Sequence, residues 1–353
     1  MRENFNAVEN ETKNPSPLKK SKIPKWIYWL LIFVIGMAGG WLIKYGFDNF
    51  NKNQSSFREI RQSGFKYINP LLECEIETKE VGSLGLLKKK VAEFIDQKSG
   101  DNIIISASVY FRDLNNGPWF GLNEKEGFSP ASLLKVPILI TYFSAAEKDS
   151  QLLDKKIIFT GKLTEDIAVP DIDSGDEMVV GQSYSVRELM RRMIVFSDND
   201  AKNLLLLNLD AKIFDQCYRD LGITIPDVRT PEDFMSVKDY ASFFRMLFNA
   251  SYLNRGFSNA ALEILTEVEF KDGLMSGVDK NVEVAHKFGE RVNMINGREV
   301  KQLHDCGIVY YPGHPYLICV MTRGQNFGEM AEVIKDISRI VYDEVERKSV
   351  VEE

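Results

Sequence analysis

Cysteine and histidine are scarce in this chain of 353 residues, and their scarcity excludes several classes of protein. Four cysteines are too few to build a disulfide framework in a chain of this size. They form no C-x-x-C pair, and the three histidines match no common metal-site spacing. These residues are Cys74, Cys217, Cys306 and Cys319, with His286, His304 and His314. We therefore expect no metal site.

An excess of positive charge is also missing, since the formal net charge is −7. Residues 1–25 carry six basic and three acidic side chains, so the acidic excess belongs to the remainder of the chain. An acidic body gives no reason to expect a nucleic-acid partner. The hydrophobic content of 44% and the charged content of 27% are ordinary for a folded protein, which the length would divide into one large or two medium domains.

One long uncharged run is present near the start. Residues 26–43 carry no charge over 18 positions, which is long enough to span a hydrocarbon core, and aromatic residues mark both ends. We predict a transmembrane helix over residues 26–45. Lysines precede the run, so residues 1–25 would form a cytoplasmic tail and the rest would be extracytoplasmic, in a single-pass protein of the cell membrane. A cleaved signal peptide is the alternative, which the long polar leader disfavours.

The remainder reads as a polar linker over residues 46–68 and a folded domain over residues 69–347. Apolar residues recur at helical spacing over residues 81–97, and two β-rich segments follow. The middle of the chain is mostly helical in pattern, and the end returns to a strand hairpin and an amphipathic helix. The β-rich segments are residues 103–111, 119–122, 304–311 and 316–321.

This order of elements predicts an α+β fold with three layers, α/β/α. An antiparallel sheet would be flanked by the N- and C-terminal helices, with an all-helical lobe inserted into it. A cleft between sheet and lobe would hold the site. In the last hairpin we expect Tyr311 to pair with Tyr316, which places Cys306 and Cys319 diagonally on one face. We interpret these two cysteines as small core residues first and as a disulfide second.

The stretch from Phe128 to Ile138 carries a serine and a lysine at helical spacing. Ser132 and Lys135 are three residues apart, so they share one face of a helix. A serine hydroxyl needs a nearby base to act as a nucleophile, and a buried lysine can be that base. The alternative is that Ser132 is a helix cap or a small core residue, because a bare S-x-x-K motif also occurs by chance at Ser16.

Two further stretches suit the same chemistry. In Ser197-Asp198-Asn199 the serine can relay a proton and the asparagine can bind a substrate amide, although a helix-capping turn is the alternative. In Lys287-Phe288-Gly289, on a predicted strand, the lysine can attract a carboxylate and the glycine lets a ligand backbone come close. The alternative for this lysine is a surface position with its stem along apolar neighbours.

In this order the three elements resemble the S-x-x-K, S-D-N and K-T-G motifs of the serine β-lactamase and penicillin-binding protein superfamily. The likeness is closer to class A β-lactamase-like domains, and it covers about residues 70–345, including the hairpin that begins at His304. The resemblance implies no metal or cofactor. It implies an acylated nucleophile, Ser132; its base or proton relay, Lys135; a proton shuttle, Ser197; an amide-binding side chain, Asn199; a carboxylate-binding side chain, Lys287, followed by Gly289; and an oxyanion hole formed by the backbone N–H groups of Ser132 and Glu290.

Two departures from the family pattern matter. The segment over residues 223–236 is short and lacks the E-x-x-L-N pattern that carries the deacylation base of class A enzymes. It offers Glu232 and Asp233, which we interpret as chance acids of a polar loop before we interpret either as a base. Phe288 stands where the family has threonine or serine, so a hydroxyl that could donate to a substrate carboxylate is lost.

We therefore predict a membrane-anchored, extracytoplasmic serine hydrolase that forms an acyl-enzyme. Its substrate would be a β-lactam or a D-alanyl-D-alanine bond of a peptidoglycan stem peptide, so it would be a β-lactamase or a DD-peptidase, with a part in β-lactam catabolism or the response to antibiotics. The alternative is a penicillin-binding sensor with low turnover, or a binding domain with impaired catalysis, as Phe288 and the short segment suggest.

Overall fold

The computed structural model describes residues 56–61, 64–77, 82–115, 117–161, 177–226, 229–295 and 297–352, together with the single residue Gly36. The chain divides into two units, residues 1–53 and 54–353. The predicted tail and transmembrane helix lie outside the described residues, apart from Gly36. Within the described residues, no helix is long and apolar enough to cross a membrane.

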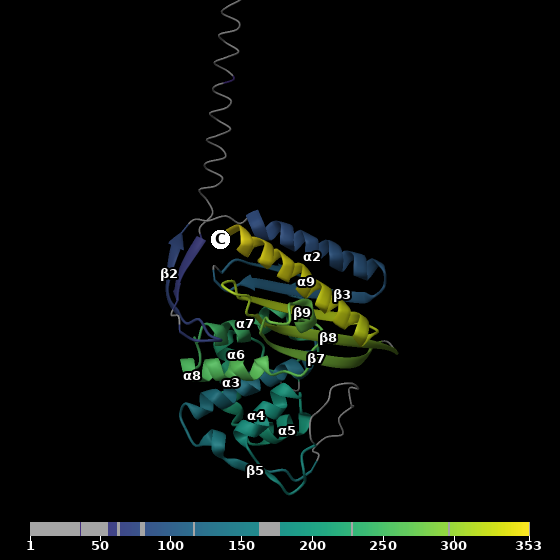
Figure 1. Ribbon diagram of the computed structural model, residues 1–353. Coiled ribbons are helices and arrows are strands. Elements are labelled where there is room, and N and C mark those ends of the chain that lie inside the picture. Colours follow the sequence, from purple (N-terminus) through teal and green to yellow (C-terminus); the bar gives the residue numbers. More distant parts are fainter. Residues whose placement is uncertain are drawn as a thin grey trace, which may run out of the picture. The chain divides into compact units, whose positions relative to one another are not determined.

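A five-stranded sheet with the order β4-β3-β9-β8-β7 forms the centre of this unit (Figure 1). All four neighbouring pairs are antiparallel, which confirms the predicted sheet. The strands are β3 (Ile104–Asp113), β4 (Trp119–Leu122), β7 (Val284–Ile295), β8 (Arg298–Val309) and β9 (Tyr316–Gly324). Strand β7 is an edge strand, so one side of its backbone is available to other parts of the chain.

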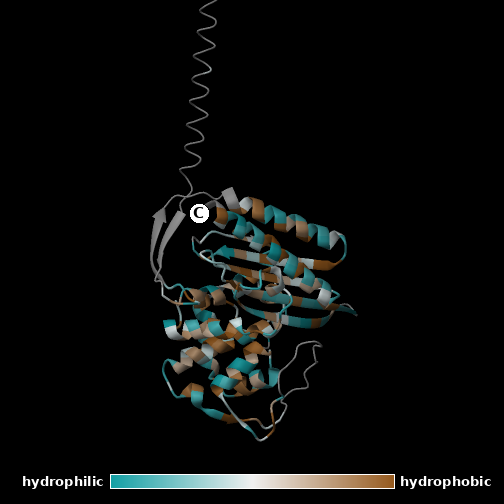
Figure 2. Ribbon diagram, in the orientation of Figure 1, coloured by the Kyte–Doolittle hydropathy of each residue, from teal (hydrophilic) through white to brown (hydrophobic). Residues whose placement is uncertain are grey.

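Two helices from opposite ends of the domain lie side by side over one face of the sheet, α2 (Gly82–Gly100) and α9 (Phe327–Glu352) (Figure 1). Hydrophobic and hydrophilic residues alternate along both (Figure 2). The buried members recur every three or four positions, as amphipathic helices require: Leu87, Val91 and Ile95 in α2, and Met330, Ile334, Ile337 and Val341 in α9. The two predicted flanking helices are confirmed.

The helical lobe is inserted between β4 and β7, as predicted. Its helices are α3 (Lys135–Ala146), α4 (Val186–Val195), α5 (Asn199–Leu207), α6 (Ala211–Leu221), α7 (Val237–Phe248) and α8 (Arg255–Thr266), with the short β5 (Lys156–Ile158) and β6 (Ser183–Ser185). Polar side chains fix several helix starts. Ser185, Asp198 and Ser236 each accept a backbone N–H of the first turn, so these helices begin where the sequence has a capping residue.

Part of the predicted linker is structured. Strand β1 (Ser56–Arg61) pairs antiparallel with β2 (Leu71–Glu77), although the sequence analysis placed residues 46–68 in a linker. Apolar and charged residues alternate in the β2 sequence but not in that of β1, so residues 56–61 have no strand pattern of their own.

The last hairpin has a different register from the one expected. Val309, and not Tyr311, pairs with Tyr316, because Tyr310 leaves the hairpin and donates its N–H to the carbonyl of Glu283 at 2.9 Å. Cys306 therefore lies directly opposite Cys319, and a disulfide joins them. The interpretation of these residues as unbonded core cysteines is wrong.

Candidate active site

Ser132 lies in a short 3₁₀ helix, η1 (Ala131–Leu134), which runs directly into α3. Lys135 follows this turn as the first residue of α3, so the junction of the two helices lies between the predicted nucleophile and its predicted base. The turn is held from behind, since the Tyr240 hydroxyl donates to the carbonyl of Leu133 at 3.0 Å. Ala131, just before the serine, has a φ of 47°, a left-handed conformation that non-glycine residues adopt mainly under local constraint.

The turn after α4 meets this helix through the side chain of Lys135, which is 1% exposed. The Nζ atom of Lys135 donates to the carbonyl of Ser197, to its Oγ atom at 2.9 Å, and to Oδ1 of Asn199 at 2.8 Å. Ser197 also has a positive φ, of 55°. Asp198 turns away from the cluster, caps α5 and forms an ion pair with Arg192 at 3.0 Å. Asp198 therefore has the capping role in this motif, while Ser197 and Asn199 are the residues that bind Lys135.

Lys287 reaches the same serine from the sheet. Its Nζ atom lies 3.1 Å from Ser197 Oγ, so this hydroxyl bridges two lysines that are 152 residues apart in the chain, a separation given by their numbers. Burial lowers the pKa of Lys287 to about 7, an effect that the negative charges of Asp305 and Glu290 partly oppose. Since the side chain is fully buried, the surface alternative for this lysine is wrong.

Phe288 is buried as well. Its ring stacks on Phe270 with centroids 4.3 Å apart, and the ammonium of Lys287 lies 3.9 Å from the Phe288 centroid. The residue that replaces the family's hydroxyl thus belongs to an aromatic layer next to the lysine, where a cation and a ring face attract each other.

Gly289 marks the closest approach of β7 to the nucleophile turn. A Cβ atom at this position would lie 3.0 Å from the carbonyl oxygen of Pro130 and 3.2 Å from the backbone nitrogen of Leu133. A side chain here would therefore press on the backbone of the nucleophile turn, so glycine suits the close approach of the two segments. Glu290 follows it on the edge strand, so the backbone N–H groups predicted to form the oxyanion hole come from two adjacent segments.

The two acids of the short segment have partners of their own. Glu232 is half exposed and pairs with Arg291 at 2.6 Å. Asp233 accepts from Gln302 at 2.9 Å and pairs with Arg323 at 3.1 Å. These contacts favour the interpretation of both as structural acids, and a role in deacylation stays a prediction.

One buried ionisable pair close to the site is not contained in any of the three motifs. His286 Nδ1 and Asp305 Oδ1 lie 2.8 Å apart, and the other Asp305 oxygen accepts the N–H of Leu274 at 3.0 Å. Asp305 fixes the segment behind β7 and contributes its charge to Lys287. The signal was an aspartate next to the apolar end of β8, since carboxylates are almost never fully buried unless they are paired.

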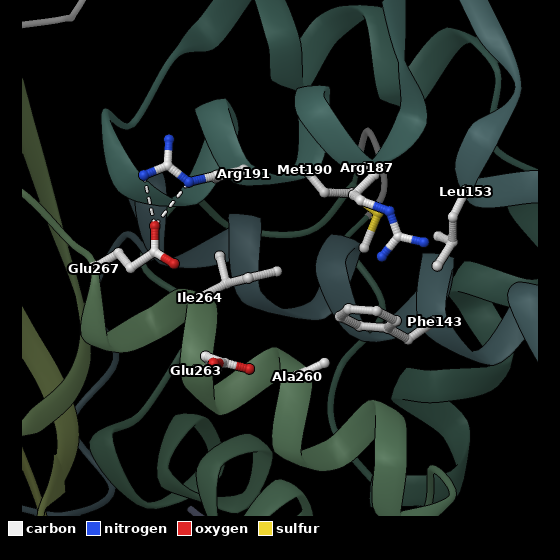
Figure 3. Close-up of a pocket in the computed structure, with 9 residues that line it drawn as sticks. All are labelled: Phe143, Leu153, Arg187, Met190, Arg191, Ala260, Glu263, Ile264 and Glu267. Carbon is white, nitrogen blue, oxygen red and sulfur yellow. Dashed lines mark hydrogen bonds and ion pairs between the residues drawn. The ribbon is translucent and has the colours of Figure 1, made fainter.

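A hollow of about 220 Å³ lies elsewhere, between α3, α4 and α8 (Figure 3). Phe143, Met190 and Ile264 form part of its wall, and Arg191 and Glu267 form an ion pair at its rim (Figure 3). None of the predicted site residues line it. In the described part of the chain no group of three His, Cys, Asp or Glu side chains is arranged to hold a metal ion.

The chain is similar to known proteins. Residues 86–345 match the model of the beta-lactamase enzyme family. The chain belongs to this family. The resemblance drawn from the three motifs is thereby confirmed, and the domain is serine β-lactamase-like.

Solved structures of this family share the fold. A mutant of PBP-A, solved as an acyl-enzyme complex with penicillin G, is 22% identical with a TM-score of 0.60, over 75% of this chain and 97% of that one. A β-lactamase from Chitinophaga pinensis is 24% identical with a TM-score of 0.61, and a class A β-lactamase from Bacteroides cellulosilyticus is 21% identical with a TM-score of 0.62. Each of these two matches covers 73% of this chain and 98% of the chain in the solved structure. A comparison with curated protein sequences finds no match.

Proposed function

We propose that this protein is a membrane-anchored, extracytoplasmic serine hydrolase that is acylated on Ser132 by β-lactams or by D-alanyl-D-alanine-type peptides. The observation that carries the proposal is the Ser197 hydroxyl, held 2.9 Å from Lys135 and 3.1 Å from Lys287. A hydroxyl between two lysine amines can pass a proton in either direction, which an acyl transfer requires at the leaving nitrogen.

In the proposed reaction Ser132 Oγ attacks the carbonyl carbon of the substrate amide. Its proton passes to Lys135, and the oxyanion accepts from the backbone N–H groups of Ser132 and Glu290. When the C–N bond breaks, Ser197 gives its proton to the leaving nitrogen and is reprotonated from its lysine neighbours. Asn199 would hold the substrate amide, and Lys287 would attract a substrate carboxylate.

The anchor and the location rest on the sequence and on one structural feature. The uncharged run over residues 26–43 predicts the membrane helix. The disulfide between Cys306 and Cys319 supports an oxidising compartment, because cytosolic thiols are kept reduced. Peptidoglycan stem peptides would then be within reach of the domain.

Slow deacylation is the second part of the proposal. Glu232 and Asp233 are each paired with an arginine, so neither is free to activate a water as a base must. The acyl-enzyme would then be long-lived, and a β-lactam would act as an inhibitor or a signal. This favours a DD-peptidase or a penicillin-binding sensor over a β-lactamase, and the PBP-A acyl-enzyme with penicillin G is a structural precedent for the fold.

Intact-protein mass spectrometry of the full chain in detergent tests both parts. After mixing with penicillin G, we expect an adduct of one penicillin mass that persists for many minutes and is absent in Ser132→Ala. An adduct that clears in wild type but persists in Glu232→Gln would instead identify a β-lactamase with Glu232 as its base. A folded wild-type protein without any adduct, towards penicillin and towards D-alanyl-D-alanine peptides, would refute the proposal.

A further inference from the structure

The segment that leads into the nucleophile turn is held by two side chains of β8. Gln302 Oε1 accepts the N–H of Ser129 at 3.0 Å, and His304 Nε2 lies 3.0 Å from the Ser129 carbonyl oxygen. The two side chains are fully buried and two positions apart, so they point from the same face of the strand. They bind both peptide groups of one residue, three positions before Ser132.

The orientation of the Gln302 amide is fixed by a further set of contacts. Its Nε2 donates to Asp233 Oδ1 at 2.9 Å, so its oxygen must face Ser129. Asp233 is in turn held by Arg323, which also donates to Glu126 and to the carbonyl of Gly127. The short segment that carries Asp233 is therefore tied to the nucleophile segment through charged and amide groups.

The protonation state of His304 is fixed as well. To donate to the Ser129 carbonyl, Nε2 must carry the hydrogen, and burial lowers the pKa of His304 to about 4, which keeps the ring neutral at ordinary pH. The ring also packs edge-on against Phe128, with centroids 5.4 Å apart. The donor is thus present throughout the neutral range, and its position does not depend on solvent.

Ala131, with its φ of 47°, lies between Ser129, which these two side chains bind, and the nucleophile Ser132. A non-glycine residue persists in such a conformation only where its surroundings hold it, and held strain of this kind gathers at functional sites. We propose that Gln302 and His304 are positioning residues for Ser132: by binding both peptide groups of Ser129 they hold the turn at Ala131, and so the direction of the Ser132 hydroxyl and N–H. The proposal rests on the proposed function, since it assigns these residues to acylation.

Two variants each remove one of the hydrogen bonds to Ser129 with little change of side-chain volume. A third variant serves as a matched control. Gln302→Met removes the acceptor, and His304→Phe removes the donor but keeps the ring against Phe128. The control is Thr322→Val on β9, which deletes a buried hydrogen bond to the Leu303 carbonyl, 2.7 Å long, without touching the nucleophile segment. All three should lower the melting temperature.

Only the first two variants should slow acylation. We expect the limiting rate of acylation by penicillin G to fall about 10–100-fold, because a misplaced reacting atom costs that much, with the half-saturating concentration changed by less than about twofold. Thr322→Val should acylate at the wild-type rate. Equal rates in wild type, Gln302→Met and His304→Phe would overturn the proposal, as would an equal loss in Thr322→Val.

A conservative variant gives a readout that general destabilisation does not. In Gln302→Glu the new carboxyl can replace the amide while protonated, since it then donates to Asp233 and accepts from Ser129. Once it ionises, it faces the Asp233 carboxylate as a like charge. The acylation rate relative to wild type should therefore fall as pH rises from about 5 to 8. A ratio that does not change with pH would count against the proposal.

Amide hydrogen exchange tests the hydrogen bond between the Ser129 N–H and Gln302 without any substrate. Exchange of the Ser129 N–H should quicken at least about tenfold in Gln302→Met and remain at the wild-type value in Thr322→Val. If wild type is not acylated by any substrate, the proposed function fails while this measurement still decides whether Gln302 holds the turn. Unchanged exchange in Gln302→Met would overturn the inference alone.

Discussion

The two lysines of the site are both fully buried, yet different groups surround their side-chain nitrogens. Lys135, from the helical lobe, donates to three oxygens of the Ser197 turn and Asn199. Lys287, from the edge strand of the sheet, has one hydroxyl oxygen at 3.1 Å and an aromatic ring at 3.9 Å. A ring face stabilises a cation less than hydrogen-bonded oxygens do in a buried site. Polar groups of the lobe thus surround Lys135, whereas on the strand Lys287 lies against Phe288, one of the two positions where this chain departs from the family pattern.

The largest expected effect comes from removing the amine of Lys135, the lysine of the helical lobe. Replacing Lys135 by methionine keeps the length of the side chain but removes the group that would take the proton of Ser132. Since a positioned base contributes about 10²–10⁴-fold, acylation by penicillin should fall by at least about 10²-fold. Stopped-flow or mass-spectrometric acylation rates measure this, and circular dichroism checks that the fold is intact. An acylation rate within a few-fold of wild type, in folded protein, would refute the role of Lys135.

Replacing the strand lysine, Lys287, by methionine should change the free energy of unfolding. The pKa of Lys287 is lowered to about 7 from the value of an unfolded chain, about 10.5, so the unfolded state binds more protons between these values. Burial of this lysine therefore destabilises the fold fully below about pH 7, and the penalty disappears as pH rises towards about 10.5. Lys287→Met should be more stable than wild type at pH 6–7 by roughly 2–5 kcal/mol.

Denaturant unfolding of both proteins at several pH values measures this difference. The advantage of Lys287→Met should shrink with rising pH, because the wild-type lysine loses its buried charge. Parallel stability curves for the two proteins between about pH 6 and 10 would show that the buried amine carries no such penalty.

The contrast between lobe and strand also explains how far the sequence could lead. Helical spacing and a capping turn are local signals, and they single out the segments that carry Lys135, Ser197 and Asn199, which the structure brings together through hydrogen bonds. The β8–β9 register depended instead on where Tyr310 leaves the hairpin, which is decided by a long-range bond to Glu283. No local pattern contains that bond, so Cys306 and Cys319 were placed diagonally.

The hydrogen-bond partners of Asp233 and Gln302 could not be predicted either, because they also lie far away in the sequence. Asp233 looked like a loop acid, and its partners Gln302 and Arg323 come from β8 and β9, far along the chain. Gln302 and His304 alternate along β8 as polar residues on a buried face, a signal that can be read from sequence only once the strand is known to face the nucleophile.

The smallest expected effect concerns Phe288, the residue that distinguishes the surroundings of Lys287 from those of Lys135. Phe288→Thr restores a hydroxyl beside Lys287, and a hydrogen bond to a charged group is worth about 1.5–3 kcal/mol. Phe288→Val is the matched control, since it opens the same space beside Phe270 without the hydroxyl. Both should lose stability, because the stacked ring is removed. If the Phe288 position faces the substrate carboxylate, the threonine variant should acylate with penicillin at a half-saturating concentration about tenfold below that of the valine variant. Equal values for the two variants would mean that the aromatic layer only supports Lys287 from behind, and that carboxylate recognition in this protein rests on the lysine alone.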